Sequence, residues 1–531
     1  MFPKETDLAA EAAAIWRAGV DAVLPSVLIP RAVQIVDGNM RFEGRGTPHK
    51  FKIPLNTVRR IAVCGAGKAG AAMAAALEEA LGDEILASKD VRGIVNVPDD
   101  TIVPLKRIEL HGARDSHDNA PTMAGVAGTR KQLQLLKPLA REDVLIVLLS
   151  GGGSALLPAP VEGVPLGDKV AIVRLLQERG ATISDVNCVR KHISAVKGGR
   201  LVYSTGAGLV VTLAISDVSG DALAVIASGP TAPDPTTFAD ALYVLGRYGI
   251  DEGDPDAPQS VIRVLRQGVA GKRPDTMKQL PDRAKNLVLA SVDDAVRMAA
   301  RHAEVLGWRV MQSKKPVDGD TSDVARAIAS FVNGADSRAA SPAGRGACLV
   351  SGGETTVDIG DKHGLGGRNQ ELALGVLQSL GAAGLRGACV LSGGTDGEDG
   401  PTDAAGAWVD EKVAARAKEL GLDPADFLAR HDSYRFFEKA GGHLKTGFTG
   451  TNVMDLRVAL VERPGTSAVL RPLAPRSATG AVVPEWNGAE PVDEHLERTV
   501  CVPAGDEVAA RLDDHDAERG RDRGRERVRG R

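Results

Sequence analysis

Apolar runs that end in glycine-rich segments are the part of the sequence best suited to bind a charged ligand. In the stretch Leu145–Leu157 the apolar run stops at Ser150, and three glycines (Gly151–Gly153) and Ser154 follow. Glycine lacks a Cβ, so its backbone N–H groups can approach an anion closely, and such loops bind ligands at the carboxyl ends of strands. The alternative interpretation is a tight turn that needs only flexible residues.

The same pattern occurs three more times. The runs that begin at Ile61, Cys348 and Cys389 end in Gly-Ala-Gly-Lys-Ala-Gly, Ser-Gly-Gly-Glu and Ser-Gly-Gly-Thr-Asp-Gly. The first also matches the GxGxxG pattern of dinucleotide sites, but the acidic residue expected about 20 positions later is not clearly placed. Together the loops predict one polar, anion-rich ligand held between several of them.

Two cations lie in this group of loops. Lys68 follows the strand that starts at Ile61, where a positive charge suits a phosphate or carboxylate; a solvated lysine is the alternative. Arg368 lies in Gly-Gly-Arg-Asn-Gln-Glu, just before an Ala- and Leu-rich helix. A positive charge beside the free N–H groups of a helix N-terminus is unfavourable unless an anion joins it, which favours a ligand there.

Carboxylates follow two predicted strands. The run Leu209–Ile215 predicts a buried strand, and Asp217 follows it at the position where parallel-sheet enzymes place catalytic or metal-binding carboxylates. Capping of a helix is the alternative role for this aspartate. Segment 393–403 mixes glycines with carboxylates, which suits hydrated Mg²⁺, although an acidic turn-rich surface loop has the same composition.

A polar helix face is predicted in segment 185–200. Asn187, Arg190, Lys191 and Lys197 fall near i, i+3, i+4 spacing, so several of them could share one face. A charged helix face that is merely solvated is the alternative.

The length and net charge of the chain indicate how many domains carry these residues and which ligands are excluded. A chain of 531 residues predicts two or three domains, and a net charge of -4 provides no basic field to attract nucleic acid. Segment 9–28 predicts a surface helix packed on the first domain, and 251–283 predicts the region joining two domains. Segment 463–531 has no sustained periodicity and predicts a disordered or loosely attached tail.

The sequence favours a soluble cytoplasmic protein. The five cysteines are scattered without a CxxC pair, mostly in apolar runs, as expected of small buried side chains in a reducing compartment. The N-terminal residues are partly acidic and lack the layout of a signal peptide, and no run is as long as a membrane span.

Five segments in the same order resemble the glycerate 2-kinases whose C-terminal part is called the MOFRL domain. They are Ser150–Leu156, Asn187–Arg200, Ser216–Pro235, Gly366–Glu371 and Gly394–Gly406, and the similarity extends over residues 8–461. The resemblance implies two α/β domains around a cleft, the first with a Rossmann-like parallel sheet. It also implies phosphorylation of the 2-hydroxyl of D-glycerate by ATP and Mg²⁺. Some members have been labelled hydroxypyruvate reductases.

The resemblance also implies an active site and a domain division. It marks Lys68 and Arg368 as central, and we expect Asp217 or Asp396 to hold Mg²⁺ or accept the hydroxyl proton. The expected domains are residues 1–280, 281–461 and the tail 462–531, with a homodimer left open. The expected catalytic residues are Lys68, Arg368, Asp217 and Asp396; the expected binding residues are Gly65, Gly67, Ser150, Gly151, Gly152, Gly153, Ser154, Asn187, Arg190, Lys191, Lys197, Glu354, Asn369, Glu371, Thr395 and Asn452; and the expected metal ligands are Asp217, Asp396, Asp399 and Asp403.

Three alternatives remain at this point. A nicotinamide-dependent (NAD(P)H) hydroxypyruvate reductase would use the GxGxxG loop, but Lys68 and the carboxylates of 396–403 are not needed for hydride transfer. A kinase could act on another small hydroxy acid. A non-enzymatic protein that binds a sugar acid or nucleotide would bind its ligand without forming a product.

Overall fold

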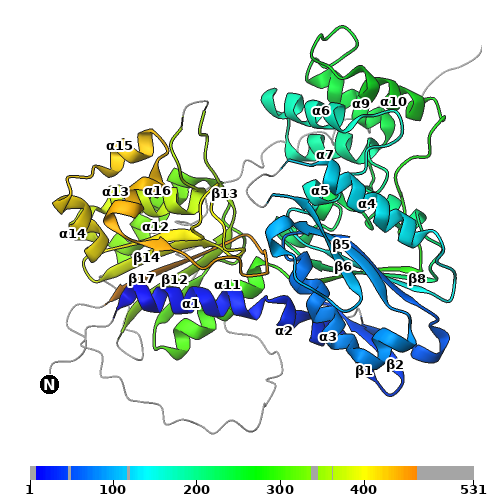
Figure 1. Cartoon of the computed structure of the whole chain (residues 1–531). Coiled ribbons are helices and arrows are strands. Elements are labelled where there is room, and N and C mark those ends of the chain that lie inside the picture. The colour runs from blue at the N-terminus through cyan, green and yellow to red at the C-terminus, as the bar shows by residue number, and fades with distance from the viewer. Residues whose placement is uncertain (1–6, 46–49, 116–119, 336–344, 361–362, 463–531) are drawn as a thin grey trace, which may run out of the picture. The chain divides into compact units, whose positions relative to one another are not determined.

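The computed structural model describes residues 7–45, 50–115, 120–335, 345–360 and 363–462. The described residues form two six-stranded sheets and two small ones (Figure 1). The tail predicted for 463–531 lies outside the described residues.

The first large sheet is entirely parallel and has the order β6-β5-β4-β7-β8-β9. This is the 3-2-1-4-5-6 order of doubly wound nucleotide-binding sheets, in which ligands bind where the strand order reverses. Here the reversal lies between β4 and β7, the two strands that precede the loops of Lys68 and Ser150. The strands are β4 (Ile61–Ala66), β5 (Arg92–Pro98), β6 (Ile108–Arg114), β7 (Val144–Leu149), β8 (Leu209–Ile215) and β9 (Ala284–Ala290).

Helices cover both faces of this sheet. The Ala-rich α3 joins the core on one face, while α6, α7, α9 and α10 build a hydrophobic cluster of their own. A three-stranded antiparallel sheet of β1 (Val33–Val36), β2 (Asn39–Glu43) and β3 (Lys50–Pro54) is packed beside α3. The helices are α2 (Pro25–Ala32), α3 (Gly70–Ser88), α4 (Met123–Leu136), α5 (Gly153–Leu156), α6 (Leu166–Glu178), α7 (Ile183–His192), α8 (Arg200–Tyr203), α9 (Phe238–Arg247) and α10 (Gln259–Val269), with short 3₁₀ turns η1 (Leu55–Thr57), η2 (Asp99–Thr101), η3 (Ser219–Asp221) and η4 (Ile226–Ser228).

The second large sheet is mixed and has the order β10-β12-β17-β14-β15-β16. Only β10 and β12 pair in parallel; β17 runs antiparallel between β12 and β14. The first residue of β17, Asp455, therefore lies beside Gly353 and Gly394, close to the ends of β12 and β14. The strands are β10 (Arg309–Gln312), β12 (Gly346–Gly353), β14 (Ala388–Gly394), β15 (Gly406–Asp410), β16 (His443–Leu444) and β17 (Asp455–Glu462), with the small pair β11 (Gly319–Asp320) and β13 (Thr355–Thr356).

Helices also cover both faces of the second sheet. One face carries a core that includes side chains of α12, α13 and α16. The other face is covered by α11 and, unexpectedly, by α1 (Leu8–Ala22). The helices of this half are α11 (Val292–Val305), α12 (Thr321–Ala335), α13 (Arg368–Gly384), α14 (Glu411–Glu419), α15 (Pro424–Ala429) and α16 (Ser433–Ala440).

The predicted position of the N-terminal helix is wrong. Instead of packing on the first domain, α1 buries Ile15 and Trp16 against α11 and the second sheet, and the Trp16 indole N–H donates to the Gly393 carbonyl at 3.1 Å. Contrary to the expectation that no run is as long as a membrane span, the stretch Leu8–Ala32, which combines α1 and α2, is long and apolar enough to cross a membrane. Half of its most apolar window is buried inside the protein, where these side chains pack in the core.

The chain passes to the second sheet later than expected. Segment 251–283, predicted as a joining region, contains α10, which packs on α9. It leads into β9, and β9 pairs with β8 in the first sheet. The passage to the second sheet occurs between β9 and α11, while the domain division by residue ranges stays a prediction.

The described cysteines match the expectation from their apolar neighbourhoods. Cys64, Cys188, Cys348 and Cys389 are all buried and unpaired. Burial raises the pKa of the Cys64 thiol to about 12, so this side chain behaves as a small apolar group. Cys501 lies outside the described residues.

Candidate active site

The loops after β4 and β7 lie in direct contact. The Lys68 backbone N–H donates to the Gly151 carbonyl at 2.8 Å, and the Ser150 hydroxyl accepts from the Ala69 N–H at 3.0 Å. A Cβ on Gly65 or Gly67 would lie 2.0 Å from the Leu148 carbonyl oxygen or the Ser150 hydroxyl, respectively. These glycines are therefore needed for the close approach of two strands at the reversal of strand order.

Lys68 links this edge of the first sheet to the second. Its ammonium nitrogen lies 2.6 Å from a carboxylate oxygen of Asp396 and 2.6 Å from one of Glu398, in the loop after β14. Burial alone would lower the pKa of Lys68, but the two carboxylates raise it. Lys68 is thus a fixed, partly buried positive charge.

Arg368 is held by a second pair of carboxylates. Its guanidinium binds Asp455 through two hydrogen bonds, of 2.7 Å and 3.0 Å, and lies 2.7 Å from Glu354. Although burial opposes it, the Asp455 charge raises the pKa of Arg368, and Arg368 in turn lowers the pKa of Asp455. Glu354 and Asp455 follow or begin strands at the same edge of the second sheet, so the pairing results from the antiparallel register.

The sequence suggested that the N-terminus of α13 binds an anionic ligand. In the structure a carboxylate of the protein itself occupies this position. The carboxylate of Asp399 accepts the backbone N–H groups of Asn369 and Gln370, both at 2.9 Å. Burial raises the pKa of Asp399 to about 6, while these hydrogen bonds oppose the shift. Asp399 was expected to bind a metal; in the structure both of its oxygens cap this helix.

Asp217 and Glu354 add negative charge to the site. Burial and the nearby charges of Glu354 and Asp396 raise the pKa of Asp217 to about 6, while the charge of Lys68 opposes the shift. Burial likewise raises the pKa of Glu354, against the influence of Arg368. A position surrounded by several carboxylates favours an added cation, and oxygen donors are the ligands that Mg²⁺ prefers.

The Gly151 backbone lies against Asp217 and Asn452. A Cβ at this position would lie 2.3 Å from a carboxylate oxygen of Asp217 and 2.1 Å from the side-chain nitrogen of Asn452. Within the described chain, no hydrogen bond uses the backbone N–H of Gly151 or Gly152. These N–H groups are available to an anion, and Gly152 takes the left-handed conformation (φ 75°) that begins α5.

A pocket of about 270 Å³ lies beside Lys68. Its walls combine apolar groups of α3 and of 98–103 with the carboxylates of Asp396 and Glu398 and the loop 448–451. Asp100, which follows β5, also lines it. The pocket therefore has a charged side and an apolar side.

The polar residues predicted to share a helix face in 185–200 are only partly solvated, and Lys197 lies in the loop after α7 instead of on the helix. Asn187, Lys191 and Lys197 are buried, whereas Arg190 is partly exposed. Lys191 pairs with Asp234 at 3.3 Å. Ser154 connects this region to the glycine loop, because its hydroxyl lies 2.7 Å from that of Ser228, which in turn donates to Asn187.

Several residues expected at the site have partners elsewhere. Asp403 has an exposed side chain that pairs with Lys445 at 2.8 Å, and Glu371 contacts His431 at 3.1 Å. The buried Thr395 hydroxyl donates to the Met454 carbonyl at 2.6 Å and so holds the loop before β17. Asn369 binds Asp399 and accepts from Ser392.

The carboxylates that could bind a metal ion do not form a complete set of ligands in the described residues. In the described ranges, no three His, Cys, Asp or Glu side chains converge into a ready-made metal site. Asp396 is paired with Lys68, and Asp217 lies near it without an ion pair among the described residues. These two oxygen donors fit an ion that arrives with further oxygen ligands, as Mg²⁺ does when bound to a nucleotide.

Sequence reasoning missed Glu398 and Asp455 as site residues. Glu398 lies in the acidic segment that was recognised, two residues after Asp396, and this spacing was a usable signal. The residues around Asp455 do not indicate its contact with Arg368, because this contact depends on the pairing of β17 with β12 and β14.

Comparison with known proteins identifies two matching families and several relatives of this chain. Residues 11–266 match a family described as a domain of unknown function (DUF4147), and residues 347–455 match the MOFRL family. Glycerate kinase of Bos taurus is 36% identical over 502 residues, covering 84% of this chain and 92% of the relative. D-glycerate 2-kinase of Thermotoga maritima is 37% identical over 437 residues, covering 82% of this chain and 99% of the relative.

A solved structure agrees with these relatives. The crystal structure of glycerate kinase from Thermotoga maritima superposes with a TM-score of 0.69 at 35% identity, covering 86% of this chain and 99% of that one. These relatives, similar over most of the chain, show that the protein is an enzyme of the kinase class. The chain belongs to the glycerate kinase family with a C-terminal MOFRL domain.

Proposed function

We propose that the protein transfers the terminal phosphoryl group of ATP to the 2-hydroxyl of D-glycerate. Phosphoryl transfer needs positioning and charge neutralisation more than covalent chemistry. The observation that carries the proposal is that Lys68 and Arg368 are each held by carboxylates, and that Lys68 contacts a glycine loop whose Gly151 and Gly152 N–H groups make no hydrogen bond among the described residues. The names of the relatives, glycerate kinase and D-glycerate 2-kinase, support the choice of substrate.

Lys68 and Arg368 would bind the glycerate carboxylate and the phosphoryl group in transfer. Both cations are already oriented by short ion pairs, so little reorganisation is needed when an anion arrives. The N–H groups of Gly151 and Gly152 would hold ATP phosphates. No GxxxxGK[ST] motif occurs in the sequence, so this cradle differs from the P-loop.

Asp217 and Asp396 would hold Mg²⁺ or accept the hydroxyl proton. A group with a pKa of about 6, as Asp217 has, is ionised at neutral pH and is still basic enough to take part in proton transfer. When bound, Mg²⁺ would supply neutralisation of phosphate charge. Asp399 and Asp403 are less suited to this role, because one caps α13 and the other pairs with Lys445.

Phosphorus NMR of the purified protein with D-glycerate, ATP and Mg²⁺ tests the proposal directly. We expect a 2-phosphoglycerate signal that requires Mg²⁺. A 3-phosphoglycerate signal would refute the regiochemistry, and no phosphorylated product from glycerate would refute glycerate as the acceptor. Parallel reactions with other small hydroxy acids distinguish a kinase of different specificity from an inactive protein.

One observation favours a second candidate, the NAD(P)H-dependent hydroxypyruvate reductase. The order of the first sheet places the Gly65–Gly70 loop where dinucleotides bind in doubly wound folds. However, the spaces beside Gly65 and Gly67 are filled by Leu148 and Ser150, so these glycines serve strand contact rather than a pyrophosphate. Oxidation of NADH or NADPH on addition of hydroxypyruvate would support the reductase over the kinase.

The setting of this activity is also a proposal. We place the enzyme in the cytoplasm, with substrate and nucleotide between a first domain of residues 1–280 and a MOFRL domain of 281–461. Light scattering of the purified protein tests whether it is a homodimer, and fractionation of cells tests the compartment.

A further inference from the structure

A second group of cations comes from α6, α7 and the loop that follows α7: they are Lys169, Arg190 and Lys197. Lys169 of α6 is 4% exposed, and its ammonium group has no hydrogen-bond partner among the described atoms. Lys197 is fully buried, and among the described residues its ammonium group donates only to the Ala227 carbonyl, at 2.9 Å. Arg190 donates to Asn187 at 3.2 Å.

These three cations influence one another, and no carboxylate balances them. Burial, together with the nearby charge of Arg190, lowers the pKa of Lys169 to about 7. Burial also lowers the pKa of Lys197, as do the charges of Lys169 and Arg190. Among the described residues, no ion pair joins any of the three to an acid. A buried group of this kind is unfavourable unless an anion completes it.

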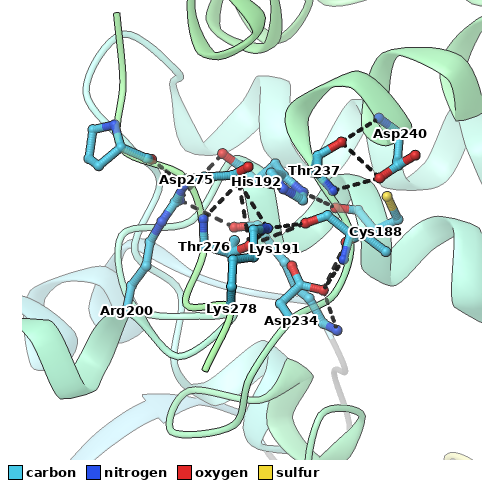
Figure 2. A network of polar contacts seen from close by, with 12 residues as sticks. Cys188, Lys191, His192, Arg200, Asp234, Thr237, Asp240, Asp275, Thr276 and Lys278 are labelled. Atoms are coloured by element: carbon cyan, nitrogen blue, oxygen red, sulfur yellow. Dashed lines mark hydrogen bonds and ion pairs between the residues drawn. The ribbon is translucent and has the colours of Figure 1, made fainter. Parts of the chain in front are cut away.

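The next residue on α7 shows the contrast. Lys191 is joined to Asp234, and His192 lies 3.0 Å from Asp275, in a network with both signs of charge (Figure 2). In that network Lys191 and His192 each lie beside a carboxylate, whereas none of Lys169, Arg190 and Lys197 does among the described residues. The lack of acids is therefore particular to the cluster and not a property of the whole helix.

The backbone opposite the cluster is held in an uncommon conformation. Ala227 and Ser228 have φ values of 51° and 60°, in the left-handed region of backbone conformation that residues other than glycine rarely adopt. This conformation directs the Ala227 carbonyl to Lys197 and the Ser228 hydroxyl to Ser154 and Asn187. Ser154 belongs to the glycine loop, so the cluster is connected to the site that would hold ATP phosphates.

We propose that Lys169, Arg190 and Lys197 form a buried subsite for the polyphosphate of the nucleotide, next to Ser154. The inference rests on the proposed function, because it assigns one part of the ATP molecule. Three cations without an acid match the several charges of a polyphosphate, whereas the single carboxylate of glycerate would leave positive charge unbalanced. Arg190 and Ser154 are only partly buried, so an anion can reach the cluster from their side.

The test is direct binding to the full-length protein, measured by calorimetry with tripolyphosphate, ATP, adenosine, inorganic phosphate and D-glycerate. Lys169→Met keeps an unbranched side chain that is one atom shorter and removes the charge. We expect at least tenfold weaker binding of tripolyphosphate and ATP, with binding of adenosine and glycerate unchanged. The matched control is Lys285→Met, because Lys285 is an exposed lysine of the same sheet-bearing half.

Thermal unfolding supplies a second measurement. Without ligand, Lys169→Met should melt no lower than the natural protein, because the lost ammonium group has no partner. With tripolyphosphate it should gain less in melting temperature. If Lys169→Met does not fold, Arg190→Gln, at a partly exposed position, tests the same loss of binding.

Three outcomes would overturn the subsite. Unchanged affinity for both polyphosphates would make Lys169 a purely structural residue. Weaker binding of glycerate alone would assign the cluster to a carboxylate. Weaker binding of inorganic phosphate with unchanged ATP binding would indicate an independent phosphate site. Tripolyphosphate binding that depends on Lys169, without any 2-phosphoglycerate product, would refute the proposed function but leave the subsite intact.

Discussion

Replacing Asp455 by Asn isolates the part of the site that orients Arg368. The side chain of Asp455 is fully buried and accepts two hydrogen bonds from Arg368. Loss of one partner of a buried ion pair costs about 3–5 kcal/mol. Arg368 is one-third exposed and keeps its contact with Glu354, so we expect a smaller loss, about 2 kcal/mol in unfolding free energy.

The effect on turnover should exceed the effect on stability. Arg368 would be held by one carboxylate instead of two, and a displacement of about 1 Å in a positioned group costs on the order of 10²-fold in rate. We expect a fall in kcat of that order, measured by phosphorus NMR or a coupled kinase assay. Asp403→Asn is the control: Asp403 is exposed, pairs with Lys445 and should change neither kcat nor melting temperature appreciably.

The difference in stability between the natural protein and Asp455→Asn should be larger at neutral pH than in acid. Because Arg368 lowers the pKa of Asp455 against the effect of burial, the carboxylate stabilises the fold above its unfolded pKa of about 4. This stabilisation is lost as the pH falls through the lower, folded pKa. Melting temperatures of the two proteins should therefore differ fully at pH 7 and converge in acid. If Asp455→Asn keeps natural turnover, Arg368 does not need this partner and the reasoning fails.

Three further predictions concern the facing edge of the first sheet. Lys68→Ala should remove most turnover without unfolding the protein, and near-natural activity with a natural circular dichroism spectrum would exclude Lys68 from catalysis. Because the pKa of Asp217 is about 6, kcat/KM should rise as the pH increases through 6; the rise should be absent in Asp217→Asn, and its persistence would assign it to another group. Gly151→Ala should reduce activity strongly, because its Cβ would lie 2.1 Å from Asn452, while a matched change at the open position Gly167 should have little effect on turnover.

Local patterns were enough to locate the loops of the site. The change from an apolar run to glycine at Ser150 and at Gly65 marks the end of a buried strand, and both loops follow strands as predicted. The order of the parallel strands then places them at one edge. Lys68 could be recognised because its loop is defined by residues adjacent to it.

Partners that depend on distant strand register were not accessible from the sequence. Arg368 was recognised as a cation that needs an anion, but the anion is Asp455, which lies beside it only because β17 runs between β12 and β14. The sequence around Lys169 contains no signal that sets this lysine apart. Its burial depends on how α6 packs with α7 and α10, which a single-helix pattern does not contain. The same reason explains α1, whose periodicity reveals an apolar face but not the sheet that covers it.

The packing of α1 on the second sheet determines when this protein can finish folding during synthesis. α1 emerges from the ribosome before the other described elements, yet the side chains that cover Trp16 and Ile15 include those of β17, the final strand of the described chain. Residues 22 and 462 are separated by roughly 20–90 s of translation at about 5–20 residues per second. Throughout that interval the newly made helix must keep its apolar face away from other chains, while the first sheet is completed as soon as β9 is available.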